Sequence, residues 1–290
     1  FLYTRVGGVT SRVSLTASNV QANDDSSFPA LSSNGSFLAF VSKADLTGVG
    51  TAGVQNLYLR KVDGSSTKLF SAGSGTGANA PVYTPVITND SRSIAYVSAA
   101  SNLVAGDSNG TSDVFLYDRA TGLTHRVSVD SAGGQADGSS SMPSISDDGN
   151  VIAFESKATN LVPGDSNGLR DLFVRNRSAG TTTRVSVDAS GAQPNGISYH
   201  STLTRDGSRV AFASQASNLV AGDTNDVADV FQRLVADPTT IDRASRNIVG
   251  DVQGDGPSDL PSYDSDDNDL TFRSSSNNLD WANVVSNNEI

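Results

Sequence analysis

The chain has 290 residues, no cysteine and a formal net charge of −11, and all of its acidic residues except Glu155 and Glu289 are Asp. The lack of cysteine excludes a disulfide framework, a thiolate metal site and a cysteine nucleophile. The negative charge argues against binding to nucleic acid or to an anionic membrane surface, since both favour a basic face. Abundant Asp, Asn, Ser and Gly are typical of a β-protein rich in turns.

The sequence offers no run of about 18 apolar residues that would span a bilayer. It begins at Phe1 without a signal-peptide pattern. We therefore expect a mature, trimmed or excerpted chain, with any export signal outside it. As a separate expectation, the protein is exported, whether periplasmic, on the cell surface or extracellular.

Short strand-like runs follow one another along the chain. Residues 1–16 hold two, one that begins with Phe1 and one that begins with Arg12. Residues 26–72 hold four: a run centred on Pro29, a run that ends in Phe40, and two runs that begin with an aromatic residue and with a cation. Alternation of apolar and polar residues over four to six positions predicts half-buried strands.

The same set of four recurs within 82–130, 141–188 and 199–246, and its first half recurs within 259–290. The aromatic residues that end the second runs lie at 40, 96, 154, 212 and 272, in steps of 56, 58, 58 and 60 residues. Turns such as Asp147-Asp-Gly join the first and second runs, and Asp-Gly is a strong hairpin signal. Four-stranded units repeated at this period predict the blades of a β-propeller.

The two chain ends match each other across one unit. Asn288-Glu-Ile290 followed by Phe1-Leu-Tyr reads like Ser112-Asp-Val-Phe-Leu-Tyr117. We therefore predict an all-β fold, a five-bladed β-propeller of four-stranded antiparallel blades, closed by pairing of the N- and C-terminal strands. Residues 1–290 would form a single domain, with blade units at about 26–72, 82–130, 141–188, 199–246 and 259–290 plus 1–16.

One repeated pattern resembles a known family. It reads Ser146-Asp-Asp-Gly-Asn-Val-Ile-Ala-Phe-Glu-Ser156 and returns at Thr204 to Ser214. It resembles the WD-like propeller repeat of the TolB family and of related exported bacterial proteins. The resemblance implies a propeller that acts mostly as a scaffold for protein contacts. TolB has six blades and an extra N-terminal domain, so the resemblance does not transfer TolB's own partners.

A polar loop of the form Asp-x-Asn-Gly-x-x-Asp, with small variations, lies between the second and third runs of three units. Ca²⁺ prefers six to eight oxygen ligands, which carboxylates, amides and carbonyls of such loops supply. The alternative is that Asp and Asn cap the turn or hold the neighbouring loop. The candidate calcium ligands are Asp107, Asn109, Asp113, Asp165, Asn167, Asp171, Asp223, Asn225 and Asp229.

A second series of polar loops connects each unit to the next, starting at Gln21, Gln135, Gln193 and Gln253. Strand direction alternates, so both loop series should emerge on one face, which we call the long-loop face. Their side chains either line a ligand rim or tie each blade to the next, and we favour the tie. We expect the recurring cations Arg12, Arg126 and Arg184 to face solvent or to form weak surface pairs with Asp.

Catalytic patterns are poorly represented. His125 looks like an exposed strand residue, and His200 has no Gly-x-Ser-x-Gly partner for a triad. Glu155 is a candidate general acid for a glycosidase, but an unpaired surface Glu is the simpler interpretation. Trp281 is the sole Trp, which weakens the case for a sugar-stacking aromatic in every blade.

We therefore expect a non-catalytic extracellular or surface scaffold, with a protein partner or assembly subunits and with Ca²⁺ as a candidate cofactor. The alternatives are a carbohydrate-binding lectin-like propeller and, less favoured, a five-bladed glycoside hydrolase.

Overall fold

In the computed structural model, which describes residues 1–70, 77–237, 239–247 and 252–279, every regular element is a β-strand. This agrees with the all-β prediction. The described residues contain no helix with the length and hydropathy of a membrane span.

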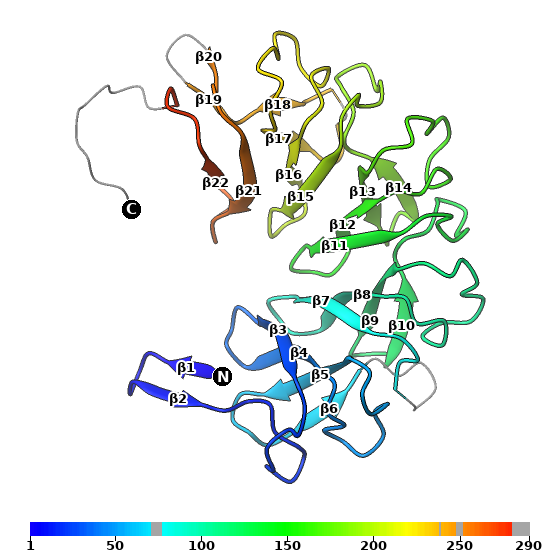
Figure 1. The fold of residues 1–290 in the computed structure, drawn as a ribbon, viewed down its shortest axis with the longest axis vertical. Helices are drawn as coiled ribbons and strands as arrows, with labels where there is room; N and C mark the ends of the chain where they lie inside the picture. The colour runs from blue at the N-terminus through cyan, green and yellow to red at the C-terminus, as the bar shows by residue number, and fades with distance from the viewer. Residues whose placement is uncertain (71–76, 238, 248–251, 280–290) are drawn as a thin grey trace.

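Four antiparallel sheets of four strands make up most of the molecule, and in each the strands lie side by side in chain order. Figure 1 shows them as blades around a common centre, with β3, β7, β11 and β15 innermost. The blades are β3–β6 (Ser26–Leu31, Phe37–Ser42, Asn56–Lys61, Thr67–Leu69), β7–β10 (Val82–Ile87, Ser93–Ser98, Asp113–Asp118, Leu123–Arg126), β11–β14 (Ser140–Ile145, Val151–Ser156, Asp171–Asn176, Thr181–Arg184) and β15–β18 (Ser198–Leu203, Arg209–Ser214, Asp229–Leu234, Asp242–Arg243).

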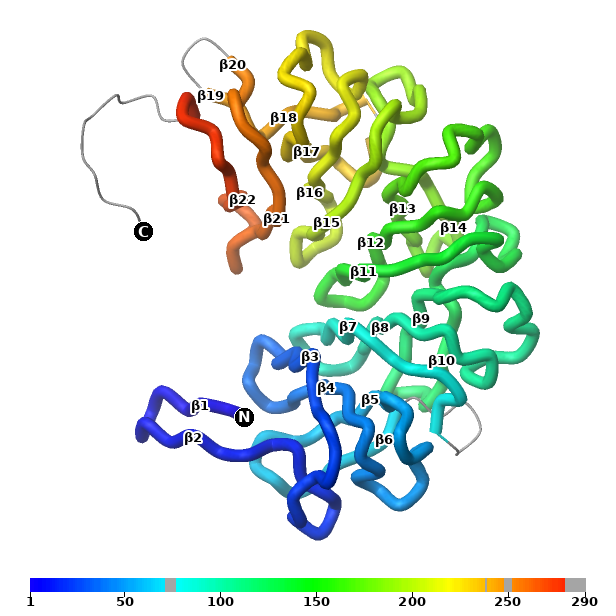
Figure 2. Tube along the Cα trace, viewed as in Figure 1, coloured from blue at the N-terminus to red at the C-terminus, as the bar shows by residue number. Residues whose placement is uncertain are grey.

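Three two-stranded sheets complete the fold: β1–β2 (Leu2–Thr4, Val9–Ser11), β19–β20 (Arg246–Asn247, Val252–Gln253) and β21–β22 (Ser258–Tyr263, Leu270–Ser274). We call β1–β2 and β21–β22 the half-blades. They lie at the two ends of an arc that is open between them (Figures 1 and 2). Among the described residues β1 pairs with β2 and β22 with β21, so the predicted pairing between the half-blades is not observed. The count of five blades and the closure of the ring stay predictions.

The core lies between successive blades. The second strand of each complete blade is almost wholly buried, and its aromatic residue pairs with the one in the third strand, as Phe154 does with Phe173. Their rings stack with centroids 5.9 Å apart. Val97 and Leu116 of the preceding blade pack into the same cluster, so each blade interface is a continuous apolar layer.

The innermost strands share a β-bulge. Register shifts interrupt the pairing of the first strand with the second in all five first strands. The bulged residue has a positive φ of 43–51° in each, and Pro follows it in every first strand except β15. Because Pro has no N–H to donate, it fits where the ladder is already broken. The bulged residues are Phe28, Thr84, Met142, His200 and Leu260.

Strand boundaries differ from the prediction in two of the four runs. The third strands begin two residues earlier than expected, so that Asp113 and Asp171 are strand residues. Three of the fourth strands, β10, β14 and β18, end at the cation instead of beginning there, whereas β6 ends one residue after Lys68. The residues after Arg126 leave the sheet because Ser128 turns back, and its Oγ accepts a hydrogen bond from the Val114 N–H.

Candidate functional site

The nine predicted calcium ligands come together in three sets, each with an arginine from the end of the fourth strand or its equivalent. In the second complete blade, Arg126 Nη2 lies 3.1 Å from Asp107 Oδ1, and its Nε lies 3.5 Å from Asp113 Oδ2. Asn109 Nδ2 donates to Asp113 Oδ2 at 2.9 Å. The next two blades repeat this arrangement with Asp165, Asn167, Asp171 and Arg184, and with Asp223, Asn225, Asp229 and Arg243. We call each set an Asp–Arg–Asp box.

The boxes are buried, which corrects the expectation that Arg126 and Arg184 lie at the surface. The side chain of Asp171 is fully buried and that of Arg184 is 8% exposed. Burial raises the pKa of Asp113, Asp171 and Asp229, against the opposing hydrogen bonds from Ser and Asn and the charge of the arginine. Each box therefore holds two carboxylates and one guanidinium away from water.

In each box, the arginine competes with Ca²⁺ for the same two carboxylates. The guanidinium already supplies a cation to both carboxylates of each box. Within the described ranges, no three side chains of His, Cys, Asp or Glu are grouped so that they could hold a metal ion. These contacts favour the alternative in which Asp and Asn hold the neighbouring loop, and the calcium site stays a prediction.

The connecting loops tie blades together, as favoured from the sequence. Gln135 Nε2 donates to Ser108 Oγ at 3.0 Å in one blade. Two residues later, Asp137 accepts from the Thr159 N–H of the next blade at 2.7 Å. Gln193 and Asn195 make the equivalent contacts one blade further on. The long-loop face is therefore held rigid by hydrogen bonds that recur from blade to blade.

A pocket of about 200 Å³ lies at the centre of the arc, lined by the bulged residues of four blades and the residues that follow them. Its apolar walls include Phe28 and Met142, which are 43% and 40% exposed. Three buried polar atoms on its lining have no hydrogen-bond partner among the described residues: Thr84 Oγ1, His200 Nδ1 and Ser201 Oγ. We call this the axial pocket. Sequence analysis missed it, although the Pro at a fixed place in the first runs marked the bulges that form it.

Glu155 lies beside the axial pocket, and the structure corrects its interpretation as an unpaired surface residue. It is 1% exposed, and its Oε2 accepts a hydrogen bond from Arg170 Nη1 at 2.9 Å. Its Oε1 accepts from the backbone N–H of His200 at 2.8 Å. Glu155 thus holds the bulge of β15, the one bulge where Ser follows the bulged residue instead of Pro. His125 is exposed on β10, as predicted, whereas Trp281 lies outside the described residues.

Comparison with known proteins shows the fold. No protein-family model and no curated protein sequence matches the chain. A structure assigned as TolB from Agrobacterium tumefaciens matches 88% of this chain and 72% of that one, with 14% identity and a TM-score of 0.54. An oligogalacturonate lyase in complex with manganese matches 86% of this chain and 58% of that one, with 16% identity and a TM-score of 0.53.

TolB from Acinetobacter baumannii matches 84% of this chain, with 17% identity and a TM-score of 0.48. The match covers 47% of that protein, so this chain spans about half of its length.

The expectation that the chain is not an enzyme is overturned by the lyase. That expectation rests on the poor catalytic patterns and on the scaffold role that the resemblance implies, whereas the fold match includes a protein that catalyses a reaction. What the likeness establishes is architecture: the chain has a TolB-like β-propeller fold.

Proposed function

We propose that the chain is a protein-binding scaffold of an exported protein, and that its axial pocket binds the partner. The observation that carries the proposal is the repeated bulge. Four inner strands each contribute the side chain at this position to the axial pocket, in a backbone conformation that non-glycine residues rarely adopt. Strained residues of this kind persist where the surrounding structure holds them, and they concentrate at binding sites.

The residues that line the axial pocket support a partner with both apolar and polar groups. Phe28 and Met142 offer apolar contact, while His200 Nδ1, Ser201 Oγ and Thr84 Oγ1 have hydrogen-bonding capacity that the chain itself does not use. An unpaired buried polar atom costs about 1–3 kcal/mol, so a ligand that pairs with it gains affinity. A protein segment with an apolar side chain next to a polar group fits both requirements.

Peptide display tests this proposal. The purified chain is panned against a random peptide library, and the enriched peptides are titrated against wild type and against Met142→Asp. We expect apolar-rich peptides to be enriched, and their affinity to fall by about tenfold or more in Met142→Asp, because a charge would be placed on the apolar wall.

Leu123→Asp is the matched control, since Leu123 is 56% exposed on the outer strand β10. It should leave the affinity unchanged. The proposal fails if no peptide is enriched, or if both variants bind as wild type does.

We further propose that the half-blades pair to close a five-bladed ring. Leu2 lies opposite Ser11, a register that places Phe1 opposite Arg12, and the Arg12 guanidinium lies 5.1 Å from the centre of the Phe1 ring. Phe173 lies opposite Arg184 in the same way, so β1–β2 has the pattern of third and fourth strands. Strand β22 is a second strand, and it is only partly buried where β12 is fully buried.

Calcium remains a proposal for the long-loop face. If Ca²⁺ binds the Asp–Arg–Asp boxes, a chelator should lower the Tm of the chain and added Ca²⁺ should restore it. An unchanged Tm in both conditions would count against it.

A further inference from the structure

Two clefts lie at equivalent places on the long-loop face, each between successive blades. The first, of about 620 Å³, separates the turn after β14 from the loop 217–222 of the next blade. The second, of about 430 Å³, separates the turn after β10 from the loop 159–164. Both volumes fall in the range of small-molecule sites, about 300–1,000 Å³.

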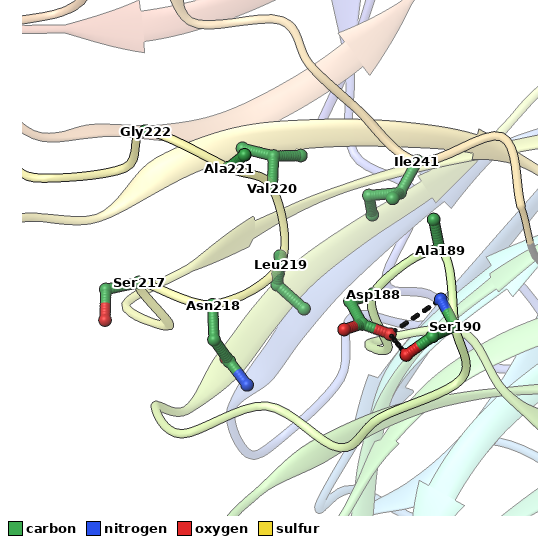
Figure 3. Close-up of a pocket in the computed structure, with 10 residues that line it drawn as sticks. All are labelled: Asp188, Ala189, Ser190, Ser217, Asn218, Leu219, Val220, Ala221, Gly222 and Ile241. Atoms are coloured by element: carbon green, nitrogen blue, oxygen red, sulfur yellow. Dashed lines mark hydrogen bonds between the residues drawn. The ribbon is translucent and has the colours of Figure 1, made fainter.

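Each cleft presents one carboxylate oxygen that the chain leaves without a hydrogen bond. In the first cleft, Asp188 Oδ1 accepts from the N–H groups of Ser190 and Ala192, both at 2.8 Å. Its second oxygen accepts none among the described residues, and Figure 3 shows it turned toward Leu219 and Asn218. In the second cleft, Asp130 Oδ1 accepts from Ala132 and Gly134, and its Oδ2 likewise has no hydrogen bond.

The rest of each cleft is preformed and apolar. Leu219 and Leu161 are buried at the base, and Val220 and Val162 pack beside them. The Asn218 side chain does not move freely, because it accepts from the Asn195 N–H and donates to the Gln193 carbonyl, both at 3.0 Å. Asn160 is held by the same two contacts in the other cleft.

Two arginines, Arg233, which is buried, and Arg175, which is half-buried, moderate the charge of the two carboxylates. Burial lowers the pKa of both arginines. The negative charges of Asp237 and Asp188 oppose this at Arg233, and that of Asp130 opposes it at Arg175. A carboxylate shared with a buried cation attracts an ammonium ligand less than a lone carboxylate would. Neutral hydroxyl groups can still donate to its open oxygen, in hydrogen bonds strengthened by the negative charge.

We propose that each cleft binds one unit of a neutral carbohydrate. Sugar hydroxyls would donate to the open oxygen of Asp188 or Asp130, and the C–H face of the ring would pack on the Leu and Val side chains. A ligand with repeating sugar units would bridge equivalent clefts and gain avidity. This site is separate from the axial pocket, so it does not depend on the proposed protein binding.

A glycan array of neutral and charged sugars, probed with the purified chain, tests the proposal. We expect binding to neutral glycans, followed by calorimetry with the strongest one. Absence of binding to every neutral glycan, or binding confined to cationic glycans or to free polyamines, would overturn it.

Two cleft-filling variants locate the site. Ala221→Trp and Pro163→Trp each place a bulky side chain at an exposed rim position of one cleft without touching the core. Each variant should abolish binding at its own cleft and leave the Tm unchanged. The double variant should weaken overall binding by about tenfold or more. Asp188→Asn should weaken binding at its site, whereas Asp63→Asn, which alters an exposed turn-capping Asp of the first complete blade, should not. Undiminished binding by the double Trp variant would contradict the assignment.

Discussion

At the scale of single residues, stability depends on the balance of charge within the Asp–Arg–Asp boxes. Each holds two buried carboxylates that only one guanidinium neutralises. Removing one partner of a buried ion pair leaves an uncompensated charge, which destabilises a protein by about 3–5 kcal/mol. The two kinds of partner in a box are therefore not equivalent.

We expect Arg184→Met to destabilise the chain by about 3–5 kcal/mol, because Asp165 and Asp171 would face each other without a cation. Asp171→Asn should be milder, at about 1–2 kcal/mol, because one carboxylate remains to pair with Arg184. Chemical denaturation at neutral pH measures both. Arg92→Met removes an exposed arginine and should stay within about 0.5 kcal/mol. Equal effects of Arg184→Met and Asp171→Asn would refute this account of the box.

The pH dependence of Arg184→Met follows from the raised pKa of Asp171. A carboxyl whose folded-state pKa is raised contributes stability that is present below its unfolded pKa, about 3.9, and is lost as the pH rises through the folded value. Without the guanidinium this loss grows. The free energy of unfolding of Arg184→Met, relative to wild type, should therefore recover between pH 7 and pH 4.5; a constant difference would contradict the prediction.

At the scale of strands, we expect the bulged residues to lower the stability of the chain while they serve binding. Met142 has a φ of 49°, in the left-handed region, where a residue with a Cβ is strained by roughly 1–2 kcal/mol. Because the side chain is 40% exposed, it gains little from burial in return. The conformation costs stability and, under the proposed function, is kept for the side chain that it presents to the axis.

Met142→Asn should therefore leave the Tm unchanged or raise it, since Asn adopts the left-handed region more readily than Met. The same variant should lose peptide binding at the axial pocket. Leu123→Asn, on the regular strand β10, is the control and should lower the Tm, because Asn is unfavourable within strands. A larger loss of stability in Met142→Asn than in Leu123→Asn would show that the bulge is not strained.

At the scale of the whole molecule, the open question is how the arc ends. Among the residues that the structure describes, the half-blades leave two sheet edges without a partner strand, and exposed edges invite association. Pairing within one chain is favoured over pairing between copies, because joined segments have an effective concentration in the millimolar range.

The register of the complete blades predicts which residues would meet. Phe154 pairs with Phe173 and Ala153 with Val174, so Phe272 should face Phe1 and Thr271 should face Leu2. In this cysteine-free chain, the double variant Leu2→Cys, Thr271→Cys should form a disulfide within one chain under mild oxidation. Non-reducing electrophoresis and peptide mapping detect it.

The pair Leu2→Cys, Asp259→Cys, with Asp259 on β21, is the negative control and should stay reduced. A disulfide that joins two chains would show exchange between copies. Failure of the first pair to oxidise would refute closure of the ring.

Much of the fold followed from the sequence because the local signals are repeated. Alternation of apolar and polar residues predicted the strands, and the Asp-Gly turns predicted the hairpins between them. A unit with weak signals could be recognised from the four units that repeat its pattern. Gln135 and Asp137 were correctly favoured as blade ties, since polar loop groups need internal partners. The sequence could not show that Glu155 is buried, because its partner His200 lies in the next blade. It could not show that the Arg126 side chain is buried either, because its partner Asp107 lies in the loop before the neighbouring strand β9.

The sequence alone determined an all-β repeat, the order of strands within each blade and the face on which the polar loops emerge, because these depend on residues close together in the chain. Only the tertiary structure decided the axial pocket, the buried Asp–Arg–Asp boxes and the paired clefts. The axial pocket joins residues about one repeat apart, the clefts join loops of successive blades, and each box joins the end of a fourth strand to the third strand and the loop before it. Whether a polar atom in these places is paired or left open depends on side-chain geometry that the linear sequence does not show.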